Sequence, residues 1–238
     1  MLVAVLADVH ANLEALQAVW ADLTACGADQ VVCLGDLVGY GPDPEAVVRF
    51  VQEHPVTCCR GNHDQAVVCP ASAMHFHPQA RLTLPVVAGL LSESSRAYLE
   101  GLPRSLKFQG AYGVHGFPPE DVFTYLHDVD DTQVAAWAAR RPLTFVGHTH
   151  ALAWLEVSGR EVVRHPLAPG AVIRLKSPSL INVGSVGQPR DATRDAKYVL
   201  WHVEASQIQV RAVPYPAQRT AAKIRARGLP EAYARRLL

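Results

Sequence analysis

The sequence predicts an α/β fold whose first half forms a mostly parallel sheet, and three patterns indicate it. Apolar runs, beginning with residues 2–7, alternate with segments of helical period, which is the order of βαβ units. Short polar clusters follow these runs directly, as they do at the carboxyl ends of parallel strands. From residue 152 onward, short alternating segments predict strands instead.

The composition argues against several classes of protein. Lysine and arginine together number 22, as do aspartate and glutamate, so the net charge gives no reason to expect a nucleic-acid or acidic-membrane partner. The five cysteines have no paired spacing, which is typical of reduced residues in a cytoplasmic protein. Residues 2–7 are too few for a membrane span and lack the preceding basic residues of a signal peptide.

The first strand ends in two polar side chains that share one side. Residues 2–7 form the continuous apolar run of a buried strand, and Asp8 and His10 follow it. In an extended segment residues i and i+2 point the same way, so these two side chains converge. Asn12 is the expected cap of the helix that comes next.

The second strand leads to a single carboxylate between glycines. Residues 30–34 form the strand, apolar from Val31 onward, and are followed by Asp36, with a glycine directly before it and another three residues later. Glycine allows backbone and metal to approach closely, so the carboxylate is unobstructed. A helix is expected from Pro44 to about residue 52.

The third strand, residues 56–59, stops abruptly at three polar groups. Asn62 offers an amide oxygen to a metal, and His63 offers a group that titrates near neutral pH. Asp64 offers a carboxylate that could orient the imidazole, although a His-Asp pair could also simply brace the loop.

The middle of the chain is predicted to cover the site and then to return to it. Residues 69–85 show no clean period and precede helical segments at 86–91 and 92–102, so we interpret 69–102 as a cover segment. Later strands end at His115 and at the pair His148 and His150. The members of this pair, two residues apart, could bind one metal or two different ones.

The last third of the chain is rich in strands and ends in helices. A polar loop at residues 182–190 interrupts the strands, and a helical tail with a break near Gly228 covers residues 217–238. The tail carries many basic residues, which usually indicates a solvated face. We see no linker or repeat, so we expect a single domain over residues 1–238. The predicted strands cover residues 153–157, 162–165, 172–175, 180–183, 198–203 and 208–213.

The clustered polar side chains form a candidate metal-binding set with oxygen and nitrogen ligands and no thiolate. Such a set suits Mn, Fe, Zn, Co or Ni, and a shared carboxylate can bridge two ions. Two adjacent ions are typical of phosphate-ester hydrolysis, and Asp36 is the expected bridge. The candidate ligands are Asp8, His10, Asp36, Asn62, His115, His148 and His150.

These residues also carry a resemblance to the calcineurin-like metallophosphoesterase superfamily. The matching motifs, in order, are Asp8-x-His10, Gly35-Asp36-x-x-Gly39, Gly61-Asn62-His63-Asp64, His115 and Gly147-His148-x-His150. The segments 35–44 and 182–190 are similar to its small bacterial phosphatase branch, YfcE-like or diadenosine tetraphosphatase-like. The resemblance implies a four-layer αββα sandwich of two mixed β-sheets flanked by helices, with the site at the strand ends.

The resemblance further implies a role for each matched residue. A hydroxide between two divalent ions, with manganese expected first, would attack phosphorus in line. His63 would protonate the departing oxygen and Asp64 would position His63. The residue after Gly116 departs from the family pattern, because Phe117 stands where relatives often have a small polar residue. The implied ligands are Asp8, His10, Asp36 and His150 for one ion, and Asp36, Asn62, His115 and His148 for the other.

Three further residues are candidates for substrate contact. Tyr40 and Arg190 could hold a base or a phosphate, but a buried hydroxyl and a surface ion pair are equally good interpretations. Ser185 could contact phosphate or serve only as a turn residue.

The sequence therefore predicts a metal-dependent hydrolase, a phosphatase or phosphodiesterase acting on small phosphomonoesters or phosphodiesters, with nucleotides among them. The chain is expected to be a cytoplasmic monomer or small homo-oligomer without membrane contact. A nuclease would need an electropositive channel, and the balanced charge and short accessory region of this chain argue against one. A silent scaffold of the same fold would typically have lost ligands, and none of the seven is missing.

Overall fold

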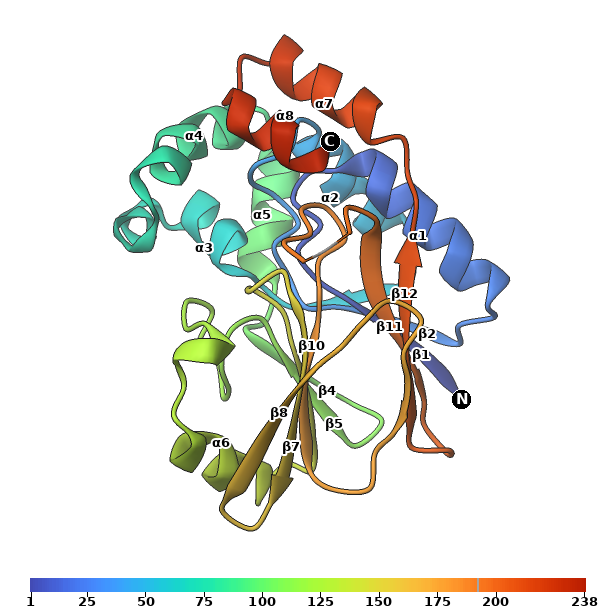
Figure 1. The fold of residues 1–238 in the computed structure, drawn as a ribbon. Helices are drawn as coiled ribbons and strands as arrows, with labels where there is room; N and C mark the ends of the chain where they lie inside the picture. Colours follow the sequence, from blue (N-terminus) through green and yellow to red (C-terminus); the bar gives the residue numbers. More distant parts are fainter. Residues whose placement is uncertain (192) are drawn as a thin grey trace.

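Two six-stranded mixed β-sheets pack face to face in the computed structural model of the chain, which describes residues 1–191 and 193–238 (Figure 1). The first sheet contains, in spatial order, β3 (Val56–Cys58), β2 (Gln30–Cys33), β1 (Leu2–Leu6), β11 (Ala196–His202), β12 (Gln207–Val213) and β9 (Val172–Arg174). The second contains β4 (Ser105–Phe108), β5 (Ala111–Val114), β6 (Leu143–Val146), β10 (Ser179–Val183), β7 (Leu152–Ser158) and β8 (Glu161–Pro166).

Helices cover the outer face of each sheet and complete the four layers that the resemblance implied, so the predicted αββα architecture is confirmed (Figure 1). The helices in chain order are α1 (Leu13–Ala25), α2 (Pro44–Glu53), α3 (Asn62–Val68), α4 (Pro78–Gly89), α5 (Glu93–Gly101), α6 (Asp131–Ala138), α7 (Ala217–Ala226) and α8 (Glu231–Leu237). Two 3-10 turns lie at η1 (Pro70–His75) and η2 (Leu126–Asp128).

The alternation of strand residues explains the layers. In β1, Val3 and Val5 pack between the two sheets, where they meet the second sheet's Phe145. Ala4 and Leu6 point the other way and pack with residues of α1 and α2. Since successive side chains of a strand face opposite sides, a strand that is apolar throughout must be buried on both.

Parallel pairing brings the polar loops to one end of the sandwich. β1, β2 and β3 run parallel in the first sheet, and β5 and β6 run parallel in the second. Backbone hydrogen bonds join the segments that follow them, from Asp8 N to Gly35 O and from Gly147 N to His115 O. The predicted strands of the last third of the chain are all present.

The cover segment is more helical than its sequence predicted. Helix α4 begins at Pro78, eight residues before the expected helical segment, and continues through Pro85. Pro78 lies in the first turn of the helix, where its missing N–H costs no hydrogen bond. Pro85 lies inside the helix, where proline normally ends one, so the sequence did not indicate a helix that continues through it. The expected start at residue 86 was therefore wrong.

The C-terminal tail is anchored to the body of the protein, with one face buried. Ile224 of α7 and Tyr233 and Leu237 of α8 belong to one buried apolar cluster. The Lys223 ammonium lies 2.6 Å from carboxylate oxygens of both Glu14 and Asp43. The basic tail is thus only partly the solvated face that its charge pattern indicated. Within residues 1–191 and 193–238, no helix combines the length and apolar character that a bilayer crossing requires.

Candidate metal centre

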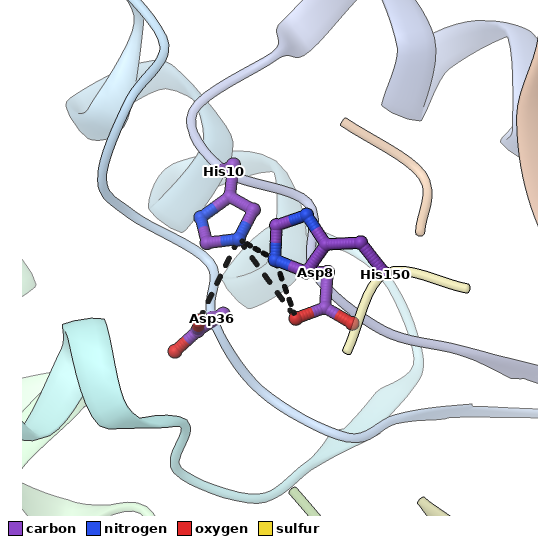
Figure 2. A group of neighbouring side chains, drawn as sticks. All are labelled: Asp8, His10, Asp36 and His150. Carbon is purple, nitrogen blue, oxygen red and sulfur yellow. Dashed lines mark hydrogen bonds and ion pairs between the residues drawn. The ribbon is translucent and has the colours of Figure 1, made fainter. Parts of the chain in front are cut away.

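The loops that follow five strands bring all seven predicted ligands into one buried cluster. One group offers four ligand atoms that lie within 4.8 Å of one another, from Asp8, His10, Asp36 and His150 (Figure 2). A second group satisfies the same limit with atoms from Asp36, His115 and His148. The Asn62 Oδ1 atom lies 2.9 Å from His115 Nε2 and so joins the second group.

The first group is arranged around the Nε2 atom of His10, as Figure 2 shows. This nitrogen lies 2.9 Å from His150 Nε2 and 3.6 Å from Asp36 Oδ2. The His150 Nε2 atom lies 3.4 Å from Asp8 Oδ1. Two carboxylates and two imidazoles therefore converge on one point.

The second group is arranged around His115 Nε2. This nitrogen lies 3.2 Å from His148 Nδ1 and 3.3 Å from Asp36 Oδ2. The Asp36 Oδ2 atom is thus shared by both groups, which is the placement that a bridging carboxylate needs.

Each of the four imidazoles has its other ring nitrogen fixed by a backbone carbonyl. Because a carbonyl only accepts, that nitrogen must carry a hydrogen, and in the neutral imidazole the nitrogen facing the cluster keeps its lone pair. Such outer hydrogen bonds set the tautomer of metal-binding histidines. The bonds are His10 Nδ1 to Val38 O (3.0 Å), His115 Nδ1 to Leu34 O (2.9 Å), His150 Nδ1 to Gln188 O (2.7 Å) and His148 Nε2 to Phe123 O (2.9 Å).

The arrangement fits a divalent cation for two reasons. The buried Asp36 Oδ2 atom has no hydrogen-bond donor within the described part of the chain. The Nε2 atoms of His10 and His150 face each other across 2.9 Å, and burial lowers the pKa of His10 to about 4, so at neutral pH two lone pairs point at the same space. A cation there would satisfy the carboxylate and both lone pairs.

Five of the seven candidate ligands have left-handed backbone conformations: Asp8, His10, Asp36, His148 and His150, with φ between 48° and 68°. Residues other than glycine adopt this region at a cost, and such residues concentrate at functional sites. Such conformations persist only where the surrounding structure holds them, and these five residues follow strands of both sheets.

Asp64 has a different task from the one the sequence suggested. Its carboxylate accepts four backbone N–H groups, from Asp36, Leu37, Val38 and Gly61, at 2.8–3.2 Å. No hydrogen bond joins it to the His63 imidazole in residues 1–191 and 193–238, so the expected direct contact was wrong. Asp64 instead fixes the loop that carries Asp36, which agrees with the alternative of a brace.

The His63 backbone holds Asp36, while its side chain faces the pocket. The His63 N–H donates to Asp36 Oδ1 at 2.8 Å, which leaves Oδ2 for the cluster. The imidazole lines a pocket with Tyr40 and Phe76, and burial lowers its pKa to about 3. A Cβ atom at Gly39 would lie 2.3 Å from His63 Nδ1, so only glycine leaves room for this ring.

The three candidate substrate contacts fall in different places. Tyr40 and Arg190 line the pocket, together with His75 and His77 of the cover segment. Ser185 is fully buried; its hydroxyl donates to Asp8 O at 2.9 Å and accepts from Gln188 N at 2.9 Å. Because both hydrogen bonds are internal, they favour the turn interpretation of Ser185 over the substrate interpretation.

Sequence reasoning missed three aromatic residues of the pocket, Phe123 and two that contact candidate site residues directly. Phe76 packs edge-on against His63 with ring centroids 4.7 Å apart, and Tyr125 stacks on His148 at 4.0 Å. Both belong to segments without a motif or a clear period. No signal in a single sequence could have placed them beside the ligands.

Metal affinity should rise with pH between about 7 and 9. Burial raises the pKa of Asp8 to about 7, and the carboxylates of Asp36 and Asp8 raise the pKa of His115 to about 9 against the opposing effect of burial. Both groups must lose their protons to bind a metal, so binding releases protons and weakens as the pH falls. Calorimetric titration with Mn²⁺ in buffers of different ionisation enthalpy would measure the protons released on binding. An affinity for Mn²⁺ that does not change between pH 6 and 9 would contradict the prediction.

Two mixed sheets with carboxylates and imidazoles gathered at their strand ends define a metal-binding α/β protein of the four-layer αββα type. The sequence profile of the calcineurin-like phosphoesterase superfamily domain matches residues 1–206. The chain belongs to this superfamily, and the predicted family is confirmed.

Individual proteins are similar to this chain over most of its length. The uncharacterized protein MJ0912 of Methanocaldococcus jannaschii is 30% identical over 244 residues, which cover 99% of this chain and 97% of that protein. The crystal structure of a metallophosphoesterase from Sphaerobacter thermophilus is similar with a TM-score of 0.87 and 34% identity, over 100% of this chain and 98% of that one. A putative diadenosine tetraphosphatase shares the fold, with a TM-score of 0.50 and 18% identity over 89% of this chain and 93% of that one.

Proposed function

We propose that this phosphoesterase hydrolyses small phosphomonoesters or phosphodiesters with two divalent ions held side by side. Asp8, His10, Asp36 and His150 would hold one ion, and Asp36, Asn62, His115 and His148 the other. The observation that carries the proposal is the shared Asp36 Oδ2 atom, which lies 3.6 Å from His10 Nε2 and 3.3 Å from His115 Nε2. When bound, such ions lower the pKa of water and neutralise charge on phosphoryl oxygens.

The chain's own residues supply orientation and a proton. Arg190 offers a planar guanidinium at the pocket mouth, suited to a bidentate grip on phosphate oxygens. His63 is the group placed to protonate the departing oxygen. Its pKa is low before the substrate binds, and we expect the negative charge of a bound phosphate to raise it.

The two alternative functions have less support. A silent scaffold has no need of seven clustered ligands, four of them imidazoles with fixed tautomers. A nuclease needs an extended basic surface, whereas lysine and arginine balance aspartate and glutamate at 22 each.

Chelation should abolish turnover, and manganese should restore it. Removal of both ions takes away several kcal/mol of charge stabilisation, so we expect a loss of about 10³-fold or more with p-nitrophenyl phosphate or its bis ester. Activity would be measured after dialysis against chelator and again after addition of Mn²⁺, Fe²⁺, Zn²⁺, Co²⁺ or Ni²⁺. Turnover that is unaffected by chelation, or absent with every ion and ester, would remove the proposal.

A further inference from the structure

A second hollow opens beside the metal pocket, and helix α8 of the C-terminal tail forms one of its walls. Tyr40, Tyr125 and Arg190 line both hollows, so the two are adjacent. Arg236 of α8 lines only the outer one. In Figure 1 the red tail lies at the same end of the molecule as α4 of the cover segment.

The position of this wall is fixed because α8 packs against α7 and against Tyr40. Tyr233 of α8 meets the Tyr40 ring edge-on, with centroids 5.0 Å apart. Tyr40 in turn lies 4.7 Å from the His10 ring and 4.6 Å from the His63 ring. The folded tail therefore holds the outer hollow next to the residues of the candidate metal centre.

The outer hollow is lined by two guanidinium groups and by no carboxylate from the described residues. Among the described residues, the Arg190 guanidinium makes one hydrogen bond, which it donates to Gln188 Oε1 at 3.3 Å. Arg236 pairs with no carboxylate in residues 1–191 and 193–238, whereas its neighbour Arg235 pairs with Glu231 at 3.5 Å. Both guanidinium groups of the hollow keep donors for an anion.

We propose that the outer hollow binds a second phosphate group carried by the substrate, with Arg236 as the residue that selects for it. The inference rests on the proposed function, because the first phosphate must lie at the metal centre. It narrows the substrates to phosphate esters whose leaving group bears a further phosphate. Arg190, which lines both hollows, lies between the two phosphate positions.

Non-hydrolysable phosphonates can test this without turnover. Alkane bisphosphonates of increasing length would be compared, by calorimetry with Mn²⁺-loaded protein, with monophosphonates of equal length. A charge-assisted arginine–phosphate contact corresponds to about tenfold in affinity, so at one length the bisphosphonate should bind about tenfold more tightly. Arg236→Ala should remove this preference, and Arg236→Lys should keep part of it.

Arg235→Ala is the matched control, because Arg235 is the adjacent arginine and its side chain is 78% exposed and paired with Glu231. The Arg235→Ala protein should keep the full preference for the bisphosphonate over the monophosphonate. The inference is overturned if monophosphonates bind but no bisphosphonate binds more tightly, or if Arg235→Ala and Arg236→Ala lose the preference equally. If no phosphonate binds and no ester is hydrolysed, the proposed function itself fails.

Discussion

Asp36→Asn should lower kcat by about 10³-fold or more and reduce the bound metal from two ions per chain. The substitution keeps an oxygen to accept the His63 N–H and replaces Oδ2, the atom shared by both ligand groups, with an amide that donates. Loss of the bridge removes several kcal/mol of charge stabilisation, and each 1.36 kcal/mol is tenfold in rate. Steady-state kinetics and elemental analysis of the dialysed protein would measure both effects.

The matched control is Asp131→Asn at the start of α6, where the carboxylate pairs with Arg164 on the protein surface. This variant should keep full activity and metal content. An Asp36→Asn protein with two tightly bound ions and near-normal kcat would show that Asp36 does not act as a bridge.

His63→Ala should lower kcat by about 10²-fold to 10⁴-fold with phenyl phosphate, which is the usual contribution of a general acid. The loss should be much smaller with p-nitrophenyl phosphate, because nitrophenolate departs without a proton. The metal content should not change, because the contact of residue 63 with Asp36 is made by its backbone N–H. Kinetics with the two esters, together with elemental analysis, would separate proton donation from metal binding.

The control is His165→Ala on β8, where the imidazole pairs with Glu156 at 3.2 Å, away from the pocket. Both esters should be hydrolysed at the normal rate by this protein. Equal losses for the two esters in His63→Ala would assign His63 a structural role in the pocket instead of proton transfer.

The positions of the candidate ligands were predictable because their signals are local. A polar cluster directly after an apolar run marks the carboxyl end of a strand, and Asp8, Asn62 and His115 all lie at such ends. The parallel order of β1, β2 and β3 follows from the same pattern. The convergence of Asp8, Asp36 and Asn62 needed only that these strands be parallel and adjacent, whereas His115 follows a strand of the second sheet and joins them through the packing of the two sheets.

Other features of the site depend on tertiary contacts that leave no mark in a single sequence. Asp64 follows His63 directly, so an Asp–His pair was the natural expectation, yet its carboxylate turns to four backbone N–H groups. The carbonyls of Gln188 and Phe123 fix two imidazoles, but any residue type has a carbonyl. The approach of α8 to the pocket likewise depends on packing across the whole chain.

Anomalous diffraction from crystals of the protein soaked with Mn²⁺ tests the central claim most directly. The account predicts two peaks about 3.5–4 Å apart, both in contact with the Asp36 carboxylate. One ion should contact His10 and His150, and the other His115 and His148. A single peak, or two peaks of which only one contacts Asp36, would contradict it.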